Sequence, residues 1–121
     1  MQNLNVIREL EISKAQVLLW IENTTRHARS ERQNRFSRLD KENLQVYKAF
    51  EVDKQHINGN EIHVITWQAE ILIFNLETKR AITVLFARPR QITRYQLRFA
   101  RVPQTIMEKA YRNLEMGYNN L

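Results

Sequence analysis

The feature that most constrains the fold is a series of four short apolar segments joined by short connections. They span residues 46–53, 61–67, 71–75 and 81–87. The first two alternate apolar and polar side chains, as half-buried strands do, and residues 71–75 are apolar on both faces, as in a central strand. Because parallel strands need long crossover connections, these short links predict an antiparallel meander. Residues 40–44 are ambiguous, since Asp40 could cap a short helix just before the first strand.

Helical spacing of apolar residues predicts helices on both sides of the meander. Residues 3–11 are expected to form one short helix, and Ser13 with Gln16 has the pattern of a capping box that opens a second helix at Lys14. The second helix either breaks at residues 23–25 or continues to about Phe36.

A last helix is expected between Pro103 and Gly117, because proline favours the first turn of a helix and glycine the position after its end. Its buried stripe is expected to be Ile106, Met107, Ala110 and Leu114. The predicted architecture is a single α+β domain over residues 1–121. In it, N-terminal and C-terminal helices cover one face of a four-stranded antiparallel sheet.

Arginines and apolar side chains both recur at helical spacing after the last expected strand. With Pro89 in the first turn of a helix, one side carries four arginines within roughly 80° of arc: Arg90, Arg94, Arg98 and Arg101. Ile92, Tyr95 and Phe99 fall on the opposite side, and no acidic residue interrupts residues 88–101. Such a cationic face suits phosphate, because arginine makes bidentate contacts with it. The alternative is an ordinary solvated charged surface.

A second arginine group precedes the sheet, at intervals of three residues. Each such interval turns an α-helix by about −60°, so only neighbouring members share a face. We therefore take Arg29, Arg32 and Arg35 as candidate phosphate contacts. For Arg26, Arg38 and Lys41 a solubilising surface is the preferred interpretation.

Composition narrows the possible functions. The formal net charge of +6 favours polyanionic partners such as RNA or DNA. The absence of cysteine excludes disulfides and thiolate metal sites and fits a reducing, cytoplasmic location. The sequence contains no signal-peptide pattern and no apolar run near the ~18 residues of a membrane span. We expect no membrane association, no metal and no cofactor, and a homodimer is possible.

Three histidines are the candidate catalytic residues: His27, His56 and His63. If Gly59 and Asn60 are the two central residues of a tight turn, His56 lies directly across from His63; if Asn58 and Gly59 are central, His63 faces Lys54. A histidine pair could act as acid and base in RNA cleavage, but without a third ligand it would be a weak metal site.

Two resemblances add expectations. The helix segment beginning His27-Ala28-Arg29, with Glu31-Arg32 after it, resembles a pattern in barnase-like and RelE-like ribonuclease toxins. Residues 82–95 resemble the last core strand of those toxins and the basic segment that follows it. That resemblance implies a sheet preceded by helices, with five candidate phosphate-facing positions: His27, Arg32, Arg88, Arg90 and Tyr95. Residues 56–95 also resemble small phage or prophage proteins of Gram-positive bacteria whose function is unassigned, which implies no chemistry.

The leading prediction is therefore a basic, phage-type accessory protein that binds the nucleic-acid backbone through arginine faces. The first alternative is a metal-independent toxin-like ribonuclease that uses histidine and arginine. The second is a phage accessory or assembly protein that binds an acidic protein. Whether the chain is an enzyme stays open.

Overall fold

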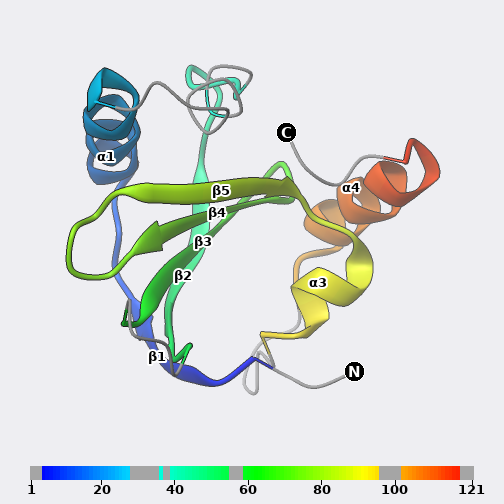
Figure 1. Cartoon of the computed structure of the whole chain (residues 1–121). Helices are drawn as coiled ribbons and strands as arrows, with labels where there is room; N and C mark the ends of the chain where they lie inside the picture. Colours follow the sequence, from blue (N-terminus) through cyan, green and yellow to red (C-terminus); the bar gives the residue numbers. More distant parts are fainter. Residues whose placement is uncertain (1–3, 28–35, 37–38, 55–58, 96–101, 118–121) are drawn as a thin grey trace.

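The protein is an α+β structure in the computed structural model, which describes residues 4–27, 36, 39–54, 59–95 and 102–117 (Figure 1). The strands are β1 (Val6–Leu10), β2 (Val46–Val52), β3 (Glu61–Thr66), β4 (Glu70–Asn75) and β5 (Ala81–Phe86). The helices within these ranges are α1 (Lys14–His27), α3 (Pro89–Thr93) and α4 (Gln104–Glu115). The strands form one antiparallel sheet in the order β1-β2-β3-β4-β5. The predicted antiparallel meander is confirmed, but it has five strands where four were expected.

The additional strand is the segment that we expected to be a short helix, residues 3–11, so that prediction was wrong. In β1, Val6 pairs with Val52 and Leu10 pairs with Ala49, with an irregularity between Val6 and Arg8. The order strand–helix–sheet also differs from the expected order, in which helices came first.

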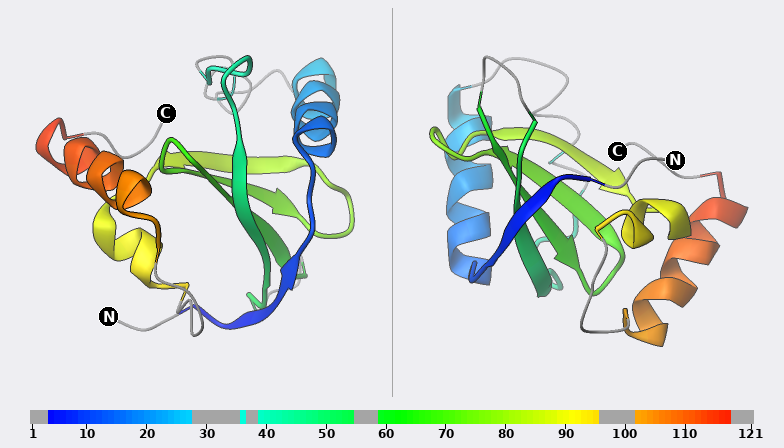
Figure 2. Two further views of the ribbon diagram at one scale, coloured as in Figure 1. Left: turned by 180° about the vertical axis from the view of Figure 1, so that it is seen from behind. Right: turned by 90° about the horizontal axis from the view of Figure 1, so that it is seen from below.

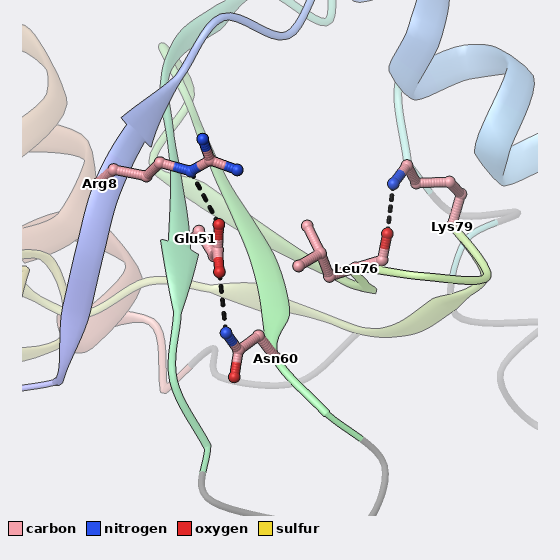
Figure 3. A network of polar contacts seen from close by, with 5 residues as sticks. All are labelled: Arg8, Glu51, Asn60, Leu76 and Lys79. Atoms are coloured by element: carbon pink, nitrogen blue, oxygen red, sulfur yellow. Dashed lines mark hydrogen bonds and ion pairs between the residues drawn. The ribbon is translucent and has the colours of Figure 1, made fainter.

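The buried carboxylate of Glu51 on β2 binds one side chain from β1 and one from the residue just before β3 (Figure 3). Arg8 Nε donates to Glu51 Oε1 at 2.8 Å, and Asn60 Nδ2 donates to Glu51 Oε2 at 2.8 Å. These bonds hold the pKa of Glu51 below its usual value, with Asn60 the largest cause. Figure 3 also shows Lys79, in the β4–β5 turn, donating to the Leu76 carbonyl.

The sheet is covered on both faces (Figures 1 and 2), which corrects the prediction that the helices share one face. Alternate residues of a strand point to opposite faces. On one face α1 packs in a cluster that includes Val17, Ile21, Ile62, Val64 and Leu72. On the other face α3 and α4 pack in a cluster that includes Ile65, Ile71, Ile92, Ile106 and Ala110. The central strands are apolar on both faces because both faces are core.

One side-chain hydrogen bond ties a helix to β5 on each face. Thr24 of α1 accepts the Ala81 N–H at 2.8 Å, and Asn113 Nδ2 of α4 donates to the Ala87 carbonyl at 2.9 Å. These bonds satisfy buried backbone groups at both ends of the strand. They fix where each helix sits along the sheet.

The ends of α1 and α4 agree with the sequence signals. Ser13 and Gln16 form the predicted capping box, with Gln16 N–H donating to Ser13 Oγ at 3.1 Å and Ser13 N–H to Gln16 Oε1 at 2.8 Å. Pro103 precedes α4, and Gly117 follows it with φ +75°. The predicted α4 stripe is right at Ile106 and Ala110 and wrong at Leu114, which is 46% exposed. Asn113 is buried in its place.

Candidate nucleic-acid interface

α3 is a short helix whose sequence explains both of its ends. Arg88 precedes it in extended conformation, and the Arg88 N–H donates to Gln91 Oε1 at 2.8 Å. Pro89 occupies the first turn, where a missing N–H costs nothing. The helix ends at Thr93, and Arg94 follows it as the C-cap. The helix predicted to carry Arg90, Arg94, Arg98 and Arg101 on one face therefore ends earlier than expected, and Arg98 and Arg101 lie outside the described residues.

The buried side of α3 faces the sheet and α4 (Figure 2). Pro89 and Ile92 are its buried residues, and Tyr95 just after it is also buried. Arg90 is exposed, while Arg88 and Arg94 are partly exposed. The predicted division into an apolar side and a cationic side therefore holds for the described part of this segment.

Tyr95 is buried, as its position opposite the arginines predicted, whereas the resemblance to ribonuclease toxins implied that it faces phosphate. It is 3% exposed, and its ring stacks on Phe50 with centroids 5.5 Å apart. The Tyr95 hydroxyl lies 2.7 Å from His63 Nδ1, and His63 Nε2 lies 2.8 Å from Glu61 Oε1. Three side chains thus form a hydrogen-bond chain from β3 to the end of α3.

Burial controls the protonation of this chain. His63 is 3% exposed, and burial lowers its pKa, although the Glu61 carboxylate acts in the opposite direction. Burial also raises the pKa of Tyr95, so its hydroxyl stays protonated. A neutral His63 with its proton on Nε2 satisfies all three groups, because Nε2–H donates to Glu61 and Nδ1 accepts from Tyr95.

Arg94 is the unusual member of the α3 arginines. Its Nε atom is buried and has no hydrogen-bond partner, and its carbonyl accepts the Leu4 N–H at 3.2 Å. Within the described residues, neither Arg90 nor Arg94 forms an ion pair with a carboxylate. A buried donor without a partner is rare in folded proteins.

The cross-strand partner of His63 differs from both predictions. Val52 pairs with Glu61 and Phe50 with His63, so both predicted registers, with His56 or Lys54 across from His63, were wrong. The connection is longer than a two-residue turn, although Gly59 has the positive φ, +81°, that the turn signal implied.

Several predicted site residues lie outside the described part of the chain, so their positions are not compared. These are His56, Arg29, Arg32, Arg35, Arg98 and Arg101. The backbone of His27 ends α1, but its side chain is outside the described set. Of the predicted site residues, the structure brings His63 into contact with Tyr95 and close enough to Arg94 for its charge to act on the imidazole, while Arg88 and Arg90 lie at the start of the same short helix.

Sequence reasoning did not select Glu61 as part of the site, although a signal existed. Glu61 and His63 are two residues apart on one strand and therefore share a face.

A second buried carboxylate lies elsewhere in the sheet: Glu70 accepts the Thr66 hydroxyl at 2.8 Å. Burial raises the pKa of Glu70. The described residues contain no group of three side chains suited to hold a metal ion.

Comparisons of the chain with protein-family profiles, curated proteins and solved structures find no match. The two resemblances noted from sequence therefore remain predictions. None of the described helices has the length and apolar character needed to cross a bilayer.

Proposed function

We propose that this protein binds the phosphate backbone of nucleic acid, with the arginines around α3 as its contact surface. The observation that carries the proposal is a pair of arginines one helical turn apart, exposed Arg90 and partly exposed Arg94, neither of which forms an ion pair with a described carboxylate. α3 also has no acidic residue in its first turn. Phosphate oxygens can accept from the accessible guanidinium nitrogens of these two arginines.

A fixed surface favours this function. The Leu4 N–H holds the Arg94 carbonyl, and the hydroxyl of neighbouring Tyr95 bonds to His63. Holding the backbone around Arg94 in place lowers the entropy lost when its side chain binds phosphate. The net charge of +6 supports the same proposal by attracting polyanions at long range. No described feature suggests base-specific readout, so we propose backbone contacts without sequence preference.

The test is fluorescence anisotropy with labelled single-stranded and duplex oligonucleotides of RNA and DNA. Arg94→Ala should weaken binding about tenfold or more, since hydrogen bonds to charged groups contribute about 1.5–3 kcal/mol. Arg80→Ala is the matched control: it removes the same charge from the turn before β5, whereas α3 follows the other end of that strand. Equal loss in the two variants would show that only net charge matters and would overturn the proposed surface.

Cleavage of RNA is less well supported than binding. His63, a predicted acid or base, is 3% exposed and uses both ring nitrogens within the protein. A general acid or base must reach the proton that it transfers. Incubating the same RNA probes with the wild-type protein in EDTA distinguishes binding from cleavage. Fragments that form at a rate proportional to the concentration of purified protein would favour the ribonuclease.

A further inference from the structure

The hydrogen-bond chain beneath α3 ends on the residue next to Arg94. Tyr95 N–H donates to the Ile92 carbonyl at 3.3 Å, so the tyrosine continues the backbone of α3. Its hydroxyl bonds to β3 through His63 Nδ1 at 2.7 Å, and Glu61 holds the opposite ring nitrogen. The position of α3 on the sheet is therefore linked to the state of one imidazole.

We propose that Glu61 and His63 are positioning residues for the α3 arginines, and that protonation of His63 weakens the docking of α3 and with it the binding of phosphate. The effect on binding rests on the proposed function. The effect on α3 docking does not, and it can be measured without any ligand.

Proton counting gives the direction of the effect. In the neutral state, the Tyr95 hydroxyl donates to Nδ1 and Nε2–H donates to Glu61. Adding a proton at Nδ1 places two hydrogens between that nitrogen and the tyrosine oxygen. The hydroxyl then has to turn away, and no second hydrogen bond to it is found among the described residues. A buried donor without an acceptor destabilises the packed arrangement.

The charges around the imidazole act in both directions. Glu61 on the same strand favours the protonated ring, whereas Lys54 after β2 and Arg94 after α3 oppose it. Burial opposes it most strongly. Release of α3 would hydrate the ring and move Arg94 away from it. The docked state therefore prefers neutral His63, and acid favours release.

Two substitutions at one position separate the two hydrogen bonds of the ring. His63→Asn keeps an oxygen near the place of Nδ1, where it can accept from Tyr95, and it cannot titrate. His63→Gln instead reaches toward Glu61 and leaves the Tyr95 hydroxyl without its acceptor. Glu61 tolerates loss of its partner in the asparagine variant, because it is partly exposed and lies 3.9 Å from Lys54.

The first measurement is amide hydrogen exchange of Ile92, Arg94 and Tyr95 at pH 7.5 and 5.5, corrected for intrinsic rates. We expect protection in the wild type to fall at pH 5.5, protection in His63→Asn to change little, and His63→Gln to be poorly protected at both values. The ¹⁵N shifts of the wild-type ring should show the Nε2–H tautomer at pH 7.5. Unchanged wild-type protection, or the same loss in His63→Asn, would overturn the proposal even if His63→Gln failed to fold.

The second measurement is oligonucleotide affinity over the same pH range. One coupled proton limits the change to tenfold per pH unit, so we expect wild-type binding to weaken about fivefold or more and His63→Asn binding by less than about twofold. His27 and His56 are retained in that variant and serve as the control. Equal pH dependence in both proteins would overturn the link to binding. Absence of binding at every pH, with pH-dependent exchange intact, would refute only the proposed function.

Discussion

Replacing Ile92 with alanine tests whether α3 is held against the sheet. α3 contains five residues, too few for a helix that is stable by itself. Its place therefore depends on the side chains that it buries. Ile92 is 0% exposed and belongs to the cluster that contains Ile106 and Ala110 of α4.

The expected loss follows from this burial. The substitution removes three carbon atoms, and at about 0.8 kcal/mol for each buried methylene the transfer contribution is about 2.4 kcal/mol. Residual cavity volume adds about 24 cal/mol per Å³. We expect the free energy of unfolding to fall by about 3–4 kcal/mol if the neighbours do not collapse into the cavity.

Urea titration can measure this loss with two intrinsic probes. Trp20 belongs to the cluster under α1, and Trp67 packs against the cluster under α3 and α4. Coincident transitions of the two signals would justify a two-state analysis. The control is Ile7→Ala, because Ile7 is 49% exposed on the edge strand and should lose less than about 1 kcal/mol. A loss for Ile92→Ala no larger than for Ile7→Ala would refute the docking of α3.

Three further predictions concern buried polar groups. Thr24→Val should lower the free energy of unfolding by about 1–2 kcal/mol in a urea titration, because the buried Ala81 N–H loses its acceptor; unchanged stability would contradict this bond. Burial raises the pKa of Glu70 above 4.5, so Glu70→Gln, which still accepts the Thr66 hydroxyl, should stabilise the protein at pH 7, with a gain that disappears below about pH 4.5. Burial lowers the pKa of His63 below 6.5, so wild-type stability should be fully present above pH 6.5 and decline as the pH falls below it, a slope that His63→Asn should reduce.

Short sequence patterns correctly predicted the structural features that depend only on residues close together in the chain. The capping pattern of Ser13 and Gln16, the positive φ of Gly59 and the proline at the start of α3 all act within a few residues. The antiparallel meander could also be predicted, because the alternation of apolar and polar side chains and the short connections restrict how the strands can pair.

The predictions were wrong where contacts between residues far apart in the sequence determine the secondary structure or the buried face. Apolar spacing in residues 3–11 is compatible with a helix, but pairing of Val6 with Val52 makes the segment a strand. In α4 the buried Asn113, which donates to the Ala87 carbonyl, takes the place expected for Leu114, and Leu114 is exposed. The same limit applied to the site. Helical spacing predicted that Tyr95 lies opposite the arginines, but it could not predict which residues Tyr95 contacts. Those contacts depend on the pairing of β2 with β3, which places Phe50 beside His63.

The salt dependence of oligonucleotide binding tests the central proposal most directly. The logarithm of the binding constant should fall linearly with the logarithm of salt concentration, with about 0.7–0.9 of slope for each phosphate neutralised. If Arg90 and Arg94 each contact one phosphate, the Arg90→Ala/Arg94→Ala double variant should bind more weakly, with a slope smaller by about 1.4–1.8 than the wild type. The same slope and affinity in a folded double variant would contradict the assignment of α3 as the phosphate-binding surface.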